Sequence, residues 1–338
     1  MNKLPAIFLF GLFHQSLSQG IIEGSIVNQK SKAPIPYANI GIAKINIGTI
    51  SNEDGSFSLK IPDGHQNDTL QFSALGYGKK TIALSSLLPF EKQVIYLNEN
   101  SIILAPVTVS SKKEKNKFFE LGNNSYQGGV IETDTIYAGR SLALLIENKQ
   151  PNFYKDFYFP VYLQKAKLRI FKNNLKLLRF RVRLNLVDSL TGQPGDDLLH
   201  QSVVIESSIR NGWLEFDLSS LHLWVAKAFF VTFEQILDSR DRTAIADGFR
   251  NFISEHPNKI DIDTVIVNGR KETRTIIKGG GMDLPGTFIG IGVSESVKSS
   301  YSSYVRDTSF GEWKKVGGIL TATVIVSNQE IKPKQVLH

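Results

Sequence analysis

The sequence predicts an all-β protein built from two β-sandwiches, the second larger, of jelly-roll type, and interrupted by one inserted helix and hairpin. Short apolar runs alternate with turn residues through most of the 338 residues, at a spacing typical of sandwiches. The composition, 41% hydrophobic and 21% charged, provides for a sizeable core. The length suggests roughly two domains.

Residues 19–98 form the first predicted domain. Phe57, Leu59 and Ile61 alternate with polar neighbours, so one face of that strand is expected to be buried and the other wet. The preceding run Asn52-Glu53-Asp54-Gly55 predicts a hairpin turn, because Asp-Gly tolerates the positive φ of tight turns. The other expected strands lie in 21–27, 40–42, 70–74 and 94–97.

Ordered motifs in this domain carry a family resemblance. They are Gly24, Pro36-Tyr37-Ala38-Asn39-Ile40, the stretch Gly48 to Phe57, and Phe72-Ser73-Ala74-Leu75-Gly76-Tyr77. The domain resembles the carboxypeptidase-regulatory-like domain. That resemblance implies a transthyretin-like sandwich, often exported, and common before the plug of TonB-dependent receptors in Bacteroidota. A shared fold assigns no chemistry.

Residues 99–126 are expected to be a linker. Lys112-Lys113-Glu114-Lys115-Asn116-Lys117 is a charged stretch that should be solvated, and Val107–Ser110 is a candidate short strand. Contact of the basic run with anionic lipid is the alternative interpretation.

Residues 127–330 form the second predicted domain. Its expected strands lie in 166–171, 178–187, 203–206, 213–218 and 229–233. Ile245, Phe249, Phe252 and Ile253 have helical spacing, and Pro257 ends that helix. A hairpin around Asn268-Gly269 follows.

Several sequence segments of this second domain also carry a resemblance. The segments are 168–171, 180–183, 191–195, 213–218, 229–231 and 311–314. They resemble the uncharacterised C-terminal region that follows the regulatory-like domain in some Bacteroidota envelope proteins. That resemblance implies no activity.

The N-terminus predicts an export signal over residues 1–18. Lys3 precedes ten residues, Leu4–Phe13, that are almost all apolar, and Ser16 and Ser18 provide a small-x-small cleavage site. A membrane anchor is the alternative, but a span requires about 20 apolar residues. We expect a protein of the periplasm or outer membrane with no transmembrane segment after signal cleavage.

Composition excludes several classes of site. The absence of cysteine excludes disulfides, thiolate metal sites and cysteine nucleophiles. The net charge of +7 is too small to indicate nucleic-acid binding without a recognition motif.

The residues of a metallocarboxypeptidase are missing. None of the histidines at 14, 65, 200, 222, 256 and 338 begins a His-x-x-Glu or His-Glu-x-x-His motif. We therefore expect no metal, no cofactor and no catalytic residues. Glu215 and Asp217 lie on one strand face, and a pair of carboxylates could in principle hydrolyse a glycoside. A surface pair is the plainer interpretation.

The most distinctive pattern is the alternation of basic residues along two of the expected strands. Each strand points three cations to one face: Lys165, Lys167 and Arg169 on the first, and Arg179, Arg181 and Arg183 on the second. Like charges facing each other repel, so this face needs anions. Either acids on neighbouring strands supply them, from among Glu206, Glu215, Asp217 and Glu234, or an acidic glycan or lipid head group does.

Aromatic residues provide a second candidate binding site. Tyr301, Tyr304 and Trp313 flank a serine-rich loop, and six more rings crowd residues 153–162. Exposed rings stack on sugars or anchor a protein partner. Packing into the core or over a sheet edge is the alternative.

These patterns favour a non-enzymatic exported envelope protein that binds a glycan or another envelope component through the second sandwich. A hydrolase of envelope polysaccharide or peptide is the second hypothesis. An accessory of a TonB-dependent uptake system is the third. A complete receptor is excluded, because a plug and a 22-strand barrel of about 10-residue strands need far more chain than follows residue 98.

Overall fold

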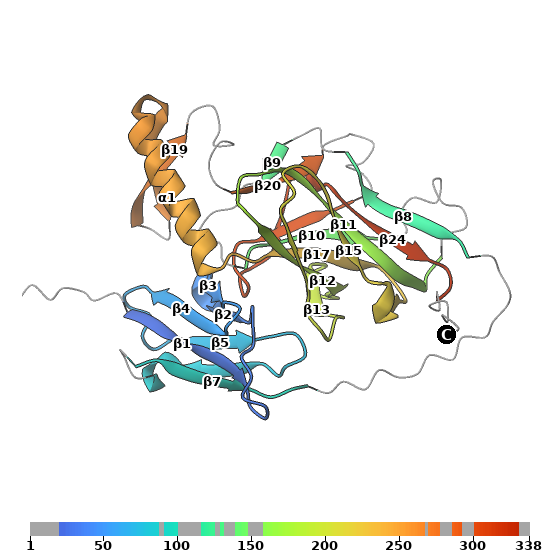
Figure 1. Ribbon diagram of the computed structural model, residues 1–338, viewed down its shortest axis with the longest axis horizontal. Helices are drawn as coiled ribbons and strands as arrows, with labels where there is room; N and C mark the ends of the chain where they lie inside the picture. The colour runs from blue at the N-terminus through green and yellow to red at the C-terminus, as the bar shows by residue number, and fades with distance from the viewer. Residues whose placement is uncertain are drawn as a thin grey trace, which may run out of the picture.

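The computed structural model describes residues 20–87, 91–100, 116–125, 129–131, 139–147, 158–267, 270–277, 286–292 and 301–330. The regular structure of these described residues is all-β apart from one α-helix and four short 3-10 helices. Figure 1 shows a smaller blue sandwich below a larger one, with the helix rising at the upper left. The predicted signal peptide, Val107–Ser110 and most of the charged run at 112–117 lie outside the described residues.

The N-terminal sandwich consists of two sheets around its own core. The first sheet has the order β4-β1-β7 and the second β3-β2-β5-β6. Their bounds are β1 Gly20–Asn28, β2 Asn39–Ile42, β3 Ile47–Ile50, β4 Ser56–Ile61, β5 Thr69–Ser73, β6 Lys80–Ala83 and β7 Gln93–Leu97, with 3-10 helices at Ala43–Ile45 and Leu84–Ser86. As the alternation predicts, Phe57, Leu59 and Ile61 are buried in this core.

The turn at Asn52–Gly55 joins β3 to β4, two strands that do not pair with each other. β3 pairs with β2, whereas β4 pairs with β1. The chain therefore crosses from one sheet to the other here, so the prediction of a hairpin was wrong. The local turn chemistry was right, because Gly55 has φ +77° and its N–H donates to Asn52 O at 3.0 Å.

The larger sandwich also has two sheets. The inner sheet, which lies toward the N-terminal sandwich, has the order β13-β12-β17-β10-β21-β22, with β14 on β12. Its bounds are β10 Ser141–Ile146, β12 Leu178–Val187, β13 Pro194–Asp197, β14 Val203–Ser207, β17 Phe229–Gln235, β21 Ser303–Arg306 and β22 Lys314–Lys315.

The outer sheet has the order β23-β20-β11-β24-β8, with β15 and β16 on β11 and β9 on β20. Its bounds are β8 Phe118–Asn123, β9 Gly129–Ile131, β11 Val161–Asn173, β15 Gly212–Asp217, β16 Trp224–Val225, β20 Thr287–Gly292, β23 Ile319–Leu320 and β24 Ala322–Ser327, with a 3-10 helix at Ser219–Leu221. Apolar side chains of both sheets meet in a single core, as the paired burial of Leu168 and Phe180 illustrates. β8 pairs with β24, so the linker predicted over 99–126 contains a strand of this sandwich.

The predicted insertion is present. Helix α1 (Ser239–Glu255) is followed by a 3-10 turn (Pro257–Lys259) and a two-stranded sheet of β18 (Ile260–Val267) and β19 (Arg270–Ile277). Asp238 begins the helix with a capping box, because its side chain accepts from Asp241 N while the Asp241 side chain accepts from Asp238 N. No helix in the described ranges is long and apolar enough to cross a membrane.

Strands β12 and β17 of the inner sheet are buried on both faces, which the sequence did not predict. Phe180, Val182 and Leu184 of β12 face the core of the larger sandwich. The alternate residues Arg179, Arg181 and Arg183 are buried as well. The N-terminal sandwich and the start of α1 cover them, so the basic face of β12 lies inside the molecule.

Candidate functional site: an ionic junction between the two sandwiches

Strand register lines up opposite charges on the covered face of the inner sheet. Arg181 lies opposite Glu234 of β17, Glu234 opposite Ser141 of β10, and Ser141 opposite Arg306 of β21. Directly opposite residues lie about 5 Å apart at Cα. A row of cation, anion, hydroxyl and cation therefore crosses four strands.

Glu234 lies at the centre of this row. It is 0% exposed, and its Oε2 accepts from Arg183 Nε at 2.6 Å. Arg183 Nη1 also donates to Asp197 Oδ2 at 3.1 Å. Burial alone would raise the pKa of Glu234, but the charges of Arg183, Arg181 and Arg306 outweigh burial and lower that pKa to about 2. Glu234 is therefore an anion at neutral pH, placed among the cations of β12 and β21.

Residues of the N-terminal sandwich complete the coordination of these charges. Asn39 of β2 donates its amide N–H groups to Glu234 Oε1 at 2.8 Å and to Ser309 Oγ at 3.0 Å, and its carbonyl oxygen accepts from Arg183 Nη2 at 2.8 Å. Arg181 Nη2 donates to the backbone oxygen of Tyr37. The first sandwich thus provides hydrogen-bond partners for the buried ion pairs of the second sandwich.

Small residues on β2 and β3 allow the close approach. A Cβ on Gly41 would lie 2.6 Å from the oxygen of Ile47 and 2.9 Å from the Phe310 ring. Next to it, Thr308 Oγ1 donates to Asn46 Oδ1 at 3.1 Å. The loop after β21 therefore packs directly on the β2–β3 pair.

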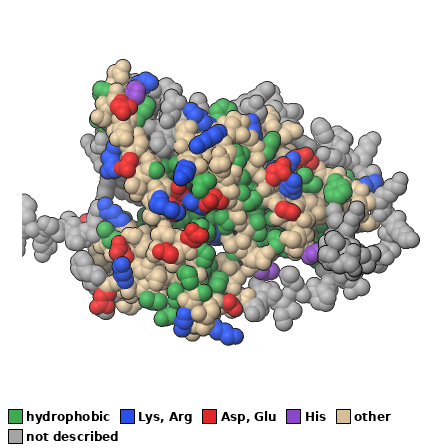
Figure 2. All heavy atoms as spheres, in the orientation of Figure 1, with side chains coloured by type: hydrophobic (Ala, Val, Ile, Leu, Met, Phe, Trp, Pro, Cys, Tyr) green, Lys and Arg blue, Asp and Glu red, His purple; other side chains and the backbone are tan. Residues whose placement is uncertain are grey.

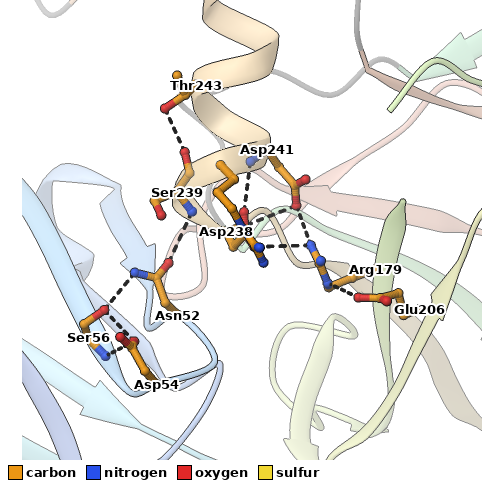
Figure 3. Close-up of polar contacts among 10 residues, drawn as sticks. Asn52, Asp54, Ser56, Arg179, Glu206, Asp238, Ser239, Asp241 and Thr243 are labelled. Carbon is orange, nitrogen blue, oxygen red and sulfur yellow. Dashed lines mark hydrogen bonds and ion pairs between the residues drawn. The ribbon is translucent and has the colours of Figure 1, made fainter. Parts of the chain in front are cut away.

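The start of α1 forms the other end of the junction (Figure 3). Arg179 Nη1 donates to Asp241 Oδ2 at 2.7 Å, and its Nε donates to Glu206 Oε2 at 2.5 Å. Ser239 N donates to Asn52 Oδ1 of the first sandwich at 3.2 Å. Burial disfavours a charged Arg179, yet Asp241 and Glu206 outweigh it and raise its pKa. We call the contacts from Arg179 to Arg306, with their partners on both sandwiches, the junction.

The second predicted basic strand lies elsewhere. Lys165, Lys167 and Arg169 belong to β11 of the outer sheet, so the two basic strands do not face each other as expected. Lys165 Nζ lies 2.6 Å from Glu215 Oε2, and Lys167 Nζ lies 2.7 Å from an oxygen of Glu120.

The remaining β11 cation also has a partner, because Arg169 Nη2 donates to Asn211 Oδ1 at 2.9 Å. On both strands, neighbouring residues of the chain therefore supply partners, including the predicted Glu206, Glu215 and Glu234. Charge alone no longer requires an external anion, and ligand binding by these six residues stays a prediction.

The three candidate aromatic residues have structural contacts. Tyr301 packs against the core, and its hydroxyl accepts from Gly122 N at 3.1 Å. Tyr304 meets Phe230 edge-to-face, with ring centroids 5.5 Å apart. The Arg306 guanidinium lies over the ring of Trp313, with Cζ 4.7 Å from the ring centroid. All three are half-buried, so their role in binding stays a prediction too.

The carboxylates considered for catalysis each have a partner within the described residues. Glu215 pairs with Lys165, and Asp217 accepts from Ser219 N at 2.9 Å. Asp197 and Asp241 have raised pKa values, for which burial is the main cause, but each contacts an arginine of the junction. In the described ranges no His, Asp and Glu cluster has the geometry of a metal site.

The comparisons with known proteins bear on the first sandwich. Residues 22–109 match the model of the CarboxypepD_reg-like domain. The N-terminal sandwich is a CarboxypepD_reg-like domain. Its matched range includes Tyr37, Asn39 and Asn52, so this domain provides the first sandwich's share of the junction.

No curated protein matches the chain. Among solved structures, an infectious bursal disease virus Gx strain structure matches at 8% identity and TM-score 0.20, covering 91% of this chain and 64% of that one. The VP2 subviral particle of the same virus matches at 9% identity and TM-score 0.19, covering 91% and 63%. The chain spans just under two thirds of the length of these viral proteins. TM-scores of this size are too low to indicate a shared fold.

Proposed function

We propose that this protein is a non-enzymatic component of the cell envelope, exported by the signal peptide at residues 1–18 to the periplasm or outer membrane of a member of the Bacteroidota. In this proposal, the second sandwich belongs to the C-terminal region that accompanies the CarboxypepD_reg-like domain in envelope proteins. It binds a glycan or another envelope component while the first sandwich is held rigidly against it.

The burial of the junction supports this proposal more than any other observation. Its arginines and carboxylates bind each other within the second domain, and Tyr37 and Asn39 of the first sandwich add hydrogen bonds to them. Glu234, with a pKa of about 2, is ionised at neutral pH and far from the pKa of about 7 that suits a general acid or base. These groups therefore hold the domains together, and recognition is left to the exposed surfaces.

We place the binding surface on the outer sheet. Lys165, Lys167 and Glu215 stand on its solvent face beside the half-buried ring of Trp213, with Lys167 Nζ 5.7 Å from the ring centroid. Figure 2 shows acidic and basic side chains side by side over the part of the molecule where β11, β15 and β24 lie in Figure 1. Fixed donors and acceptors around an indole suit the hydroxyl groups and apolar faces of a sugar.

Cross-linking in the native envelope tests this proposal. Tagged wild-type protein is expected to capture a glycan or an envelope protein, and the Trp213→Ala/Lys167→Ala variant is expected to lose that capture. The matched control is Lys60→Ala, on an exposed strand position of the first sandwich. If nothing is captured and the purified protein degrades an envelope polymer, the proposal is wrong and a hydrolase takes its place.

A further inference from the structure

Two tryptophans stand on the solvent face of the outer sheet. Trp213 of β15 and Trp224 of β16 both lie on strands that pair with β11. The residues that follow them, Leu214 and Val225, belong to the core of the larger sandwich. Because consecutive side chains of a strand point to opposite faces, both indoles point away from that core. Trp224 is 41% exposed, and Trp213 is half-buried.

The distance between the two indoles suits a chain molecule better than a single sugar ring. Their partners on β11 are Arg169 for Trp213 and Tyr162 for Trp224, with one bulged residue between those partners. At a rise of about 3.3 Å per residue, the two positions are about 20 Å apart along the strand. One sugar ring covers one indole, so a ligand that reaches both must contain several linked sugar residues.

The surface between the indoles carries many charges but no net charge. Three cations and three carboxylates lie on it or directly beside it: Lys165, Lys167, Arg169, Glu120, Glu215 and Asp217. Lys165 pairs with Glu215 at 2.6 Å, and Lys167 pairs with Glu120 at 2.7 Å. An anionic polymer gains little from such a surface, because attraction and repulsion cancel. Hydroxyl groups can donate to the carboxylates and accept from the ammonium groups, so the surface matches a neutral ligand rich in hydroxyls.

We propose that the outer sheet binds a neutral polysaccharide chain that lies along β11 and β15 from Trp213 to Trp224. The apolar faces of two of its sugar residues pack on the two indoles. The hydroxyl groups between them form hydrogen bonds with the ion-paired lysines and carboxylates. This inference rests on the proposed function and narrows its ligand from any glycan or envelope component to one chemical class.

Affinity gel electrophoresis of the full chain tests the class of polymer. The neutral probes are dextran, galactomannan, laminarin and hydroxyethyl cellulose, and the anionic probes are alginate and polygalacturonate. At least one neutral polymer is expected to retard the protein, and a tenfold rise in ionic strength should leave that retardation unchanged, because salt screens only charge–charge attraction. Retardation by the anionic polymers alone, by no polymer, or only at low salt would overturn the proposal.

Variants of the two indoles test the geometry. Trp213→Ala and Trp224→Ala are each expected to weaken binding of the retarding polymer about tenfold, because each removes one stacked ring. Trp224→Phe keeps an aromatic face and should keep most of the affinity, which separates loss of stacking from loss of folding. Tyr96→Ala removes a similarly exposed ring (37%) from the first sandwich and should leave the affinity unchanged. Equal binding by the wild-type protein and Trp224→Ala would contradict the proposal, as would equal affinities for long oligosaccharides and for the disaccharide, which reaches only one ring.

The cross-linking experiment distinguishes this inference from the proposed function. If an envelope protein is captured while the purified protein binds no neutral polysaccharide, the inference is wrong and the proposed function stands. If nothing is captured and an envelope polymer is degraded, both are wrong.

Discussion

Replacing Glu234 by glutamine removes the central anion of the junction without changing the shape of the side chain. In the wild-type protein, Arg183 and Arg181 lower the pKa of this carboxyl from 4.5 to about 2. At about 1.4 kcal/mol per pKa unit, the charged form is stabilised by about 3 kcal/mol relative to the protonated form. Glu234→Gln also leaves the buried Arg183 without its nearest carboxylate, and breaking a buried pair costs about 3–5 kcal/mol. We expect a loss of stability in that range.

The assay is urea unfolding at pH 7, followed by circular dichroism and tryptophan fluorescence. Glu215→Gln is the control, because it breaks an ion pair with Lys165 that is exposed on both sides (37% and 46%), and such pairs contribute about 0–1 kcal/mol. If Glu234→Gln costs less than about 1 kcal/mol, or no more than Glu215→Gln, the reasoning about the junction is wrong.

Three further predictions concern the same contacts. The pKa of Glu234 is lowered in the folded state, so the stability that this carboxylate contributes is complete above the unfolded pKa of 4.5 and is lost as the pH falls toward about 2. The free energy of unfolding, measured from pH 6 to pH 2, should therefore fall in the wild-type protein. It should fall with a smaller slope in Glu234→Gln. Asp238→Ala removes the cap of α1 and should cost about 1–2 kcal/mol, with faster hydrogen exchange in the first turn of the helix; unchanged exchange there would show that the capping box is dispensable. Gly41→Ala places a Cβ 2.9 Å from the Phe310 ring and should lower the melting temperature by several degrees, whereas Gly20→Ala, with nothing within 4 Å of its Cβ, should leave it unchanged.

Period-2 patterns predicted the strands of the two sandwiches well where one face met a core and the other met water. Phe57, Leu59 and Ile61 illustrate this in β4. The helix was found for a similar reason, since Ile245 and its partners recur at helical spacing before Pro257. Such local signals reflect contacts that a residue makes whatever its distant neighbours are.

The arrangement of the strands depends on contacts that the sequence does not display. Asn52–Gly55 has the chemistry of a tight turn, but pairing with β1 and β2 decides which sheets that turn connects. β8 was hidden in the predicted linker because its pairing partner, β24, lies about two hundred residues away. Local patterns carry no information on such distant pairing.

The basic strand β12 shows the same limit at the candidate site. Alternating Arg179, Arg181 and Arg183 indicated a cationic face that needs anions, because arginine is seldom buried without a partner. The partners exist: the sequence suggested Glu206 and Glu234 among the acids, and the structure adds Asp241 and Asp197. Nothing in the sequence marked Asn39 as the residue through which the first sandwich joins them.

An engineered disulfide tests the central claim, that the two sandwiches are fixed against each other through this face. The chain has no cysteine of its own, so Asn46→Cys/Gly311→Cys introduces a single pair. A Cβ on Gly311 lies 3.2 Å from Asn46 Cγ, close to the separation of about 3 Å that an S–S bond of 2.05 Å gives between a sulfur and the opposite Cβ.

The account predicts that this disulfide forms fully under mild oxidation of the full-length protein. A control pair, Ser58→Cys/Gly311→Cys, should stay reduced, because Ser58 is exposed on the sheet that lies away from the junction. Free thiols in both double variants after oxidation would contradict the account and show that the sandwiches do not meet where the ionic junction places them.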